Sequence, residues 1–198
     1  QVNEKIDDGP IIFYETRVFP HSCKIPQDYF NFENNNIKSF YEKFIKYILK
    51  GHRFKLIQQP PYLKTYFPRL DTSINSWIDW SIKDVSLINF INAFDDPYSG
   101  AKTKINNISV VIKKAHLHGG EVLNHEYFSG LIIRKEKNFI VVATGYSSVL
   151  LIEEILDRSK NNIVSKLKLG DRFYTPSNVI DKSLKERAYF SSKGKISK

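Results

Sequence analysis

Apolar side chains recur with helical spacing in two parts of the chain. In residues 37–49 they are three and four positions apart, which predicts one face of a helix: Ile37, Phe40, Tyr41, Phe44, Ile45, Ile48 and Leu49. Gly51 is expected to end this helix, and its aromatic face is expected to pack in a core. A second helix is predicted after a capping box, Ser81-x-x-Asp84, with one apolar face: Val85, Ile88, Ile91 and Phe94.

Short apolar runs of β type dominate the middle of the chain. They are residues 108–115, 130–134, 138–144 and 149–153, and turn-forming or charged residues separate them. Several short strands with tight turns predict a small, partly open β-barrel of the oligonucleotide-binding (OB) type. After it, Thr175-Pro176 predicts the start of a short helix with Val179, Ile180 and Leu184 on one face. The basic tail SSKGKISK is expected to be frayed.

The first residues have the pattern of the end of an α/β unit. The short apolar run Ile11-Ile12-Phe13 follows a turn, Asp8-Gly9-Pro10. Residues 56–79 contain three prolines and no lasting apolar period, so they are expected to run extended over a surface. The predicted division is therefore an α/β portion at 1–50, a connecting strap at 51–80 and a barrel-like domain at 81–198.

Composition restricts the class of protein. The chain has 198 residues, of which 41% are hydrophobic and 26% charged, so it can bury a core and wholesale disorder is excluded. It has no apolar run of membrane-spanning length and no visible signal peptide. The single cysteine, Cys23, cannot form an internal disulfide, so a cytoplasmic location is expected. Because the chain starts at Gln1 and has no methionine, we expect it to be a piece of a longer protein.

The chain is basic, with a formal net charge of +9 from 30 Lys and Arg against 21 Asp and Glu. An excess of this size attracts polyanions or phosphorylated ligands. General lysine enrichment would give the same charge, so both interpretations stay open.

Four stretches resemble the formyltetrahydrofolate-dependent formyltransferases, the family of methionyl-tRNA formyltransferase and of the amino-sugar N-formyltransferases. The residues that carry the resemblance, in family order, are Ile6-Asp7-Asp8-Gly9-Pro10-Ile11-Ile12, then Tyr66-Phe67-Pro68-Arg69-Leu70 with Trp77-Ile78-Asp79-Trp80-Ser81, then residues 90–101 (FINAFDDPYSGA), and then Leu169-Gly170-Asp171-Arg172-Phe173. The resemblance covers the C-terminal two-thirds of the family pattern. It implies the end of a Rossmann-like catalytic domain followed by an OB-like domain, that is, α/β plus a β-barrel.

The resemblance also implies a reaction and its residues. An Asn, a His and an Asp form the site in this family, and the Asp corresponds to Asp7 here. The formyl donor would be 10-formyltetrahydrofolate, with no metal, and a neutral amine would attack the formyl carbon while hydrogen-bond donors stabilise the oxyanion. The pterin is expected near the residues around Asp7: Val2, Asn3, Ile6 and Asp8.

Two departures from the family pattern affect what the chain can do. The Asn and His would precede Gln1, so we expect this chain alone to be inactive. Asp95-Asp96-Pro97-Tyr98 replaces the N-P-W-P of the methionyl-tRNA enzymes. This variant slightly favours a nucleotide-linked amino sugar over methionyl-tRNA as acceptor, and a homodimer is allowed.

Basic residues of the barrel offer a second line of reasoning. Lys113, Lys114 and Arg134 could contact acceptor or RNA phosphates, or they could be solvated lysines and arginines that protect sheet edges. The alternative function is accordingly a non-catalytic, basic RNA-binding module. Other sites are disfavoured, because His116, His118 and His125 lack further ligands for zinc and Cys23 lacks a catalytic partner.

Overall fold

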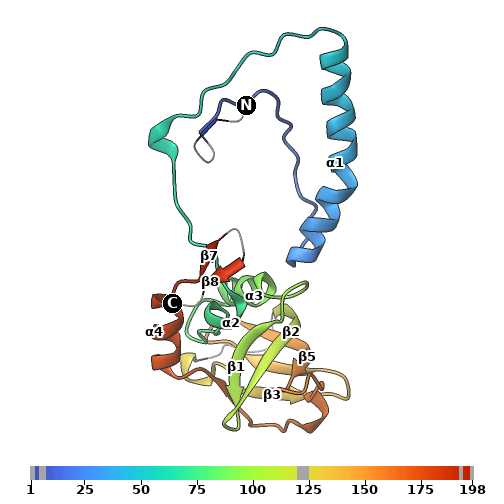
Figure 1. The fold of residues 1–198 in the computed structure, drawn as a ribbon. Coiled ribbons are helices and arrows are strands. Elements are labelled where there is room, and N and C mark those ends of the chain that lie inside the picture. The colour runs from blue at the N-terminus through green and yellow to red at the C-terminus, as the bar shows by residue number, and fades with distance from the viewer. Residues whose placement is uncertain (1–2, 5–7, 120–124, 192–193, 197–198) are drawn as a thin grey trace. The chain divides into compact units, whose positions relative to one another are not determined.

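The computed structural model describes residues 3–4, 8–119, 125–191 and 194–196, and the chain divides into two compact units (Figure 1). The first unit comprises Gln1–Cys23 and Asp28–Phe67, and the second comprises Lys24–Gln27 and Pro68–Lys198. Within the described ranges, no helix has the length and apolarity needed to cross a membrane.

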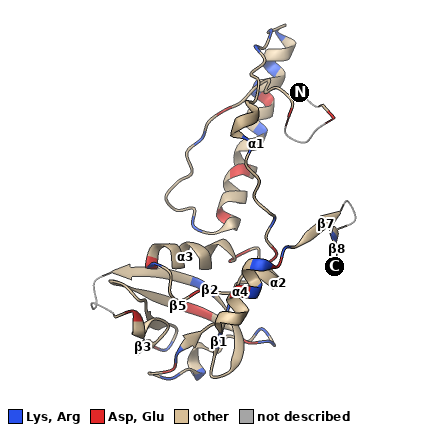
Figure 2. Cartoon of the chain, turned by 90° about the vertical axis from the view of Figure 1, so that its left-hand side faces the viewer, with Lys and Arg blue, Asp and Glu red and all other residues tan. Residues whose placement is uncertain are grey.

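Helix α1 (Pro26–Leu49) starts eleven residues before the predicted helix. A proline suits the first turn of a helix, and Asp28 places a negative charge near the positive end of the helix dipole. In Figure 2 both acidic and basic residues occur along α1. The segment of the helix before Ile37 is mostly polar, with Tyr29, Phe30 and Phe32 as its aromatic residues, so the apolar spacing did not extend the prediction to the start of the helix. The helix ends before Gly51, which has a φ of +70°.

Aromatic packing holds the first unit together. The Phe13 ring lies in the middle of four others, with ring centroids 5.2–6.1 Å away: Phe40, Phe44, Tyr47 and Phe54. The predicted apolar face of α1 is therefore only half covered, because no residue of the helix is buried and Tyr41, Ile45 and Ile48 are each more than half exposed. The described residues of this unit contain one isolated bridge, Ile11 with Ile57, so a Rossmann-like origin stays a prediction.

The predicted strap ends inside the second unit. It contains the short helices η1 (Pro61–Leu63) and α2 (Thr72–Asn75), with extended chain between them. Ser76, Ile78 and Trp80 are buried, and Ile78 and Trp80 belong to the core of the second unit. The three-domain division stays a prediction, but the residues after Pro68 group with the barrel-like part of the chain.

A six-stranded antiparallel sheet forms the centre of the second unit. Its strands are β1 (Ala101–Ile105), β2 (Ile108–Gly119), β3 (Ile132–Lys135), β4 (Ile140–Ala143), β5 (Ser148–Leu156) and β6 (Phe173–Tyr174), in the order β3-β4-β5-β2-β1-β6. All four predicted runs contain a strand, whereas β1 and β6 were not predicted. Asn106 and Asn107 adopt positive φ angles of 48° and 65° and form the two-residue turn between β1 and β2.

The two edges of this sheet meet through backbone hydrogen bonds. Ile132 N–H donates to Asp171 O and Phe173 N–H donates to Gly130 O, both at 2.8 Å. Gly130 has a φ of +81°, and a Cβ there would lie 2.2 Å from Phe173 O, so the close approach requires glycine. The sheet is therefore curled, which confirms the predicted barrel-like part in outline, while the OB assignment stays a prediction.

Helix α3 (Asp84–Ala93) packs on the sheet through Leu87, Ile88 and Ile91. The predicted capping box is wrong, because the Ser81 hydroxyl donates to Asp79 Oδ1 at 2.6 Å and the helix has Lys83 at its N-cap. The helix consequently begins later, and Val85 is 58% exposed instead of facing the core.

The end of the chain differs from the prediction in two respects. Helix α4 (Ser177–Lys185) buries Ser183 and leaves Leu184 exposed, with Pro176 at its N-cap. Strands β7 (Tyr189–Ser191) and β8 (Gly194–Ile196) then form a hairpin, so the described part of the tail is not frayed. Two further short helices, η2 (Glu126–Phe128) and η3 (Val164–Lys166), lie in the loops of the sheet.

A buried polar contact in the core gives a first prediction. The Trp80 indole N–H donates to Thr103 Oγ1 at 2.9 Å, beside the stack of Trp80 on Phe173. Thr103→Val keeps the shape but leaves this buried donor unpaired, so we expect a loss of about 1–3 kcal/mol in the free energy of unfolding, measured by urea titration. Thr103→Ser keeps the hydroxyl and serves as the control; an equal loss in both variants would contradict the assignment.

Asp71 gives a second prediction, on pH. Its carboxylate caps α2 and forms an ion pair with Lys195 of β8 at 3.1 Å. The hydrogen bond from the Ser73 hydroxyl, followed by the one from Lys195, holds the pKa of this carboxyl below its ordinary value. Stability from Asp71 is thus present above the ordinary carboxyl pKa and is lost as the pH falls through the lowered one.

In Asp71→Asn, the free energy of unfolding should therefore decrease less steeply as the pH falls below about 4. At neutral pH the substitution should lower the free energy of unfolding by about 1 kcal/mol. Urea titrations between acid and neutral pH measure both effects. Asp181→Asn, at an exposed position of α4, is the control and should leave the acid decline unchanged. An acid decline of wild-type steepness in Asp71→Asn would contradict the prediction.

Candidate functional site

The predicted catalytic residue, Asp7, and the predicted cofactor contacts Val2 and Ile6 lie outside the described residues. The two remaining predicted contacts are described. Asn3 Nδ2 donates to Asp8 Oδ2 at 3.4 Å, and the Asp8 carboxylate forms an ion pair with Lys64. The carboxylate of Asp8 is thus engaged within the protein, which leaves a cofactor contact through this group a prediction.

The segment after Asp7 is held by residues 57–64, which include η1. Ile11 and Ile57 exchange backbone hydrogen bonds of 2.8 and 3.0 Å, and Gln59 Nε2 donates to Gly9 O at 2.7 Å. Together with the Asp8–Lys64 pair, these contacts fix the D-G-P turn from one side. Sequence reasoning missed Gln59 and Lys64, because their partners lie 50 and 56 positions away and neither residue belongs to a recognisable motif.

The loop that departs from the family pattern, residues 94–100, is locked by a buried ion cluster. Asp95 is 2% exposed and accepts hydrogen bonds from the backbone N–H groups of Asp96 (2.7 Å) and Lys114 (2.8 Å). Lys113 Nζ lies 3.6 Å from Asp95 Oδ1, pairs with Asp96 and donates to Tyr98 O at 3.2 Å. The shape of this loop therefore depends on the positive charge of Lys113, which lies on β2.

This cluster bears on the three predicted phosphate contacts. Lys113 is 9% exposed and faces carboxylates, which argues against a role in phosphate binding. Lys114 pairs with Glu154 at 2.8 Å, and this hydrogen bond raises its pKa. Arg134 belongs to β3 and not to a loop, with its guanidinium 6.0 Å from the centroid of the Phe139 ring. Phosphate contact through Lys114 or Arg134 stays a prediction.

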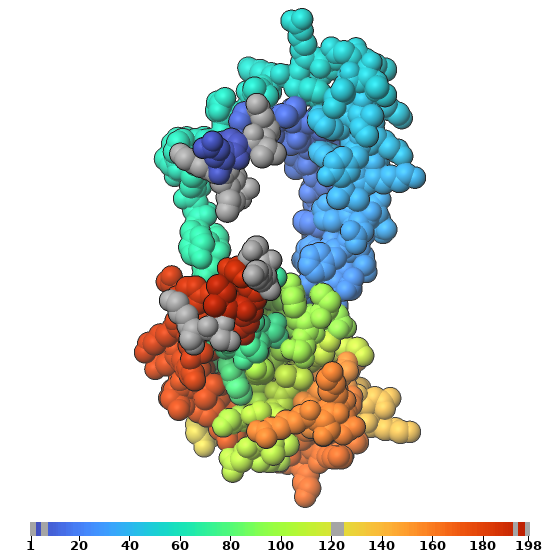
Figure 3. Space-filling view, viewed as in Figure 1, coloured from blue at the N-terminus to red at the C-terminus, as the bar shows by residue number. Residues whose placement is uncertain are grey.

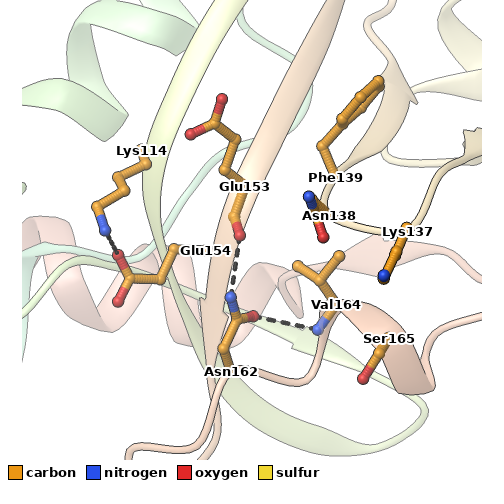
Figure 4. Close-up of a pocket in the computed structure, with 9 residues that line it drawn as sticks. All are labelled: Lys114, Lys137, Asn138, Phe139, Glu153, Glu154, Asn162, Val164 and Ser165. Atoms are coloured by element: carbon orange, nitrogen blue, oxygen red, sulfur yellow. Dashed lines mark hydrogen bonds and ion pairs between the residues drawn. The ribbon is translucent and has the colours of Figure 1, made fainter.

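Lys114 and Phe139 contribute to one groove on the second unit (Figure 4). Its volume is about 580 Å³, and its lining carries charges of both signs: Lys114, Lys137, Asn138, Phe139, Glu153, Glu154, Asn162, Val164 and Ser165. The side-chain amide of Asn162 satisfies backbone groups of β5 as a neighbouring strand would. It donates to Glu153 O (3.0 Å) and accepts from Ile155 N–H and Val164 N–H (3.2 Å each). The groove therefore has a largely polar lining in which side chains of both charges lie close together.

The described residues contain no group of three or more His, Cys, Asp and Glu side chains that could hold a metal ion. His125 Nδ1 accepts a hydrogen bond from Tyr127 N–H at 3.1 Å and so caps η2. Cys23 is a free thiol.

The second unit is thus a curled antiparallel sheet covered by one helix, with a fixed loop between α3 and β1 and a charged groove at one sheet end. Residues 72–167 match the family model of the formyl transferase C-terminal domain. The second unit therefore contains a segment that matches the formyl transferase C-terminal domain.

Solved structures agree with this assignment at the level of the fold. Two variants of HypX from Aquifex aeolicus superpose with TM-scores of 0.54 and 0.56, at 15% and 17% identity, over 100% and 99% of this chain. A complex of HypX with tetrahydrofolic acid superposes less well, with a TM-score of 0.40 over 76% of this chain at 16% identity and 25% of the HypX chain. The chain spans about a third of the HypX chains, 33% and 34% in the first two structures. No curated protein matches the chain.

Proposed function

We propose that this chain is part of an enzyme that transfers a formyl group from 10-formyltetrahydrofolate to a primary amine. The formyl transferase C-terminal domain over residues 72–167 carries the proposal. The I-D-D-G-P-I-I stretch at residues 6–12 adds to it, because it resembles the family signature that contains the catalytic Asp. A folate donor is in keeping with HypX, which has been crystallised in complex with tetrahydrofolic acid.

Asp7 is the residue of this chain to which we assign a direct part in the chemistry. Its carboxylate would accept the N–H of a histidine, orient that ring and raise its basicity, so that the ring can move a proton from the attacking amine to the leaving nitrogen. An asparagine and the histidine would stabilise the oxyanion of the tetrahedral intermediate. We assign neither of these two residues within the 198 positions.

The acceptor that we propose is a nucleotide-linked amino sugar. The support is the loop at residues 94–100, where Asp95 and Lys113 fix a D-D-P-Y turn in place of the N-P-W-P of the methionyl-tRNA enzymes. The test compares kcat/KM for the full-length gene product on a nucleotide-linked amino sugar and on methionyl-tRNA. We expect the sugar to be preferred by at least about tenfold, a difference of about 1.4 kcal/mol. Equal values, or a preference for methionyl-tRNA, would contradict the acceptor assignment.

One observation favours a second candidate, a domain that binds RNA without catalysis. Two arginines stack on aromatic rings of the second unit: Arg172 lies 4.8 Å from the centroid of Tyr127, which is 70% exposed, and Arg134 lies near Phe139. Such pairs can stack unpaired bases. This candidate predicts RNA binding that weakens steeply between about 50 and 200 mM salt, in a protein without formyl transfer. Negligible RNA affinity at about 50 mM salt would exclude it.

A further inference from the structure

A second cavity, which we call the Arg69 cleft, lies between the end of α3, the residues before α2 and the β7–β8 hairpin. Its volume is about 510 Å³, within the range of small-molecule sites, and more of its lining is apolar than polar. The lining residues are Arg69, Leu70, Asp71, Thr72, Ser73, Ala93, Phe94, Tyr98 and Phe190. In Figure 3 the red C-terminal residues lie directly against green residues of the same unit, as this lining requires.

Three aromatic residues contribute to the walls of the cleft. Phe94 is 5% exposed, whereas Tyr98 and Phe190 are 43% and 37% exposed. Rings of this kind stack on planar heteroaromatic groups such as nucleobases.

Arg69 supplies a cation at the same place. Its guanidinium lies 4.4 Å from the centroid of the Phe190 ring, and among the described residues no carboxylate lies within 4.0 Å of it. The acid in the lining, Asp71, is engaged by Lys195 at 3.1 Å and by Ser73 N–H at 2.8 Å. A guanidinium stacked on a ring keeps its fork of N–H donors, which matches the oxygens of a phosphate.

Both walls of the cleft are positioned by contacts already described. The wall formed by Tyr98 is held through the backbone of this residue. The Tyr98 carbonyl accepts a hydrogen bond from Lys113 Nζ (3.2 Å), and the Tyr98 N–H donates to Asp95 O (2.9 Å). The Phe190 wall belongs to the hairpin that Lys195 ties to Asp71 and to the Ser73 hydroxyl (3.2 Å). The cleft is thus largely formed before any ligand binds, which lowers the entropic cost of binding.

We infer that the Arg69 cleft binds a nucleoside diphosphate, with the base against Tyr98 and Phe190, a phosphate on Arg69 and a hydroxyl partner at Thr72. Within the proposed function, this ligand is the nucleoside diphosphate portion of the amino-sugar acceptor. That identification of the ligand rests on the proposed function. The binding itself does not, because it follows from the aromatic walls and the unneutralised guanidinium.

Three probes separate the parts of the site: UDP, uridine and inorganic pyrophosphate. Titration calorimetry of the full chain with each of the three probes should rank UDP as the tightest. Arg69→Gln should weaken UDP and pyrophosphate by about tenfold and leave uridine unchanged, and Arg69→Lys should fall between. Phe190→Leu should weaken UDP and uridine but not pyrophosphate.

Arg158→Gln removes an exposed arginine from a turn outside the cleft and is the matched control. An equal loss in Arg158→Gln and Arg69→Gln would overturn the inference, since binding would then be general attraction to a basic chain. Failure of UDP to bind would also overturn it, whether or not formyl transfer is found. UDP binding through Arg69 without any formyl transfer would support the cleft and count against the proposed function. Unfolding midpoints of the variants equal to wild type show that each loss is local.

Discussion

Replacing Asp7 with asparagine in the full-length gene product is expected to lower kcat for formyl transfer by about 10²- to 10⁴-fold. The amide has the shape of the carboxylate but not its charge, so it can neither stabilise a protonated histidine nor raise its basicity. The unfolding free energy should stay close to that of the wild type. Initial rates of tetrahydrofolate release at saturating acceptor measure the change.

A carboxylate of the same unit that lies outside the predicted site offers the control for this experiment. Glu42 of α1 is at an exposed position and forms an ion pair with Lys38 at 3.9 Å. Glu42→Gln should leave kcat unchanged. Near-normal turnover in Asp7→Asn, or equal losses in both variants, would contradict the catalytic assignment of Asp7.

The second large effect is expected in stability. Asp95→Ala should lower the free energy of unfolding by about 3–5 kcal/mol, because it removes one partner of a buried ion pair and leaves two backbone N–H donors without their acceptor. Asp96→Ala removes the other carboxylate of Lys113, but the Asp96 side chain is 52% exposed, so the loss there should stay below about 1 kcal/mol.

Urea titrations of the wild type and the two variants decide between these expectations. Equal losses would show that the cluster acts through its total charge and not through the burial of Asp95. A small loss in both would show that the loop at residues 94–100 keeps its shape without the cluster.

The parts of the fold that could be predicted from the sequence have strong local signals. Runs of Val, Ile and Leu predict β2, β4 and β5 because such residues fit the pleated and largely buried surface of a sheet. Strand β1 was missed because its inward residues, Ala101, Thr103 and Ile105, alternate with lysines and include only one large apolar side chain. Strand β6 has two residues and exists only because β1 pairs with it.

The candidate sites, like the strands, could be predicted only where a local sequence pattern marks them. A catalytic role for Asp7 can be predicted because this residue belongs to a motif, and it stays a prediction, whereas the buried position of Lys113 could not be predicted. A lysine in a strand predicts exposure. Lys113 is buried because Asp95 and Asp96, which lie 18 and 17 positions earlier in the chain, pack against β2. The Arg69 cleft depends on three segments that meet only in the folded unit, and no local pattern marks Arg69 as a ligand contact.

Transfer of the formyl carbon itself tests the central claim most directly. The full-length gene product would be incubated with 10-formyltetrahydrofolate labelled with carbon-13 in the formyl group and with a nucleotide-linked amino sugar, and the products followed by NMR. We expect the label to appear in a formamide on the sugar nitrogen as tetrahydrofolate is released. Label that stays on the folate with the amino sugar, and equally with methionyl-tRNA, would contradict the account.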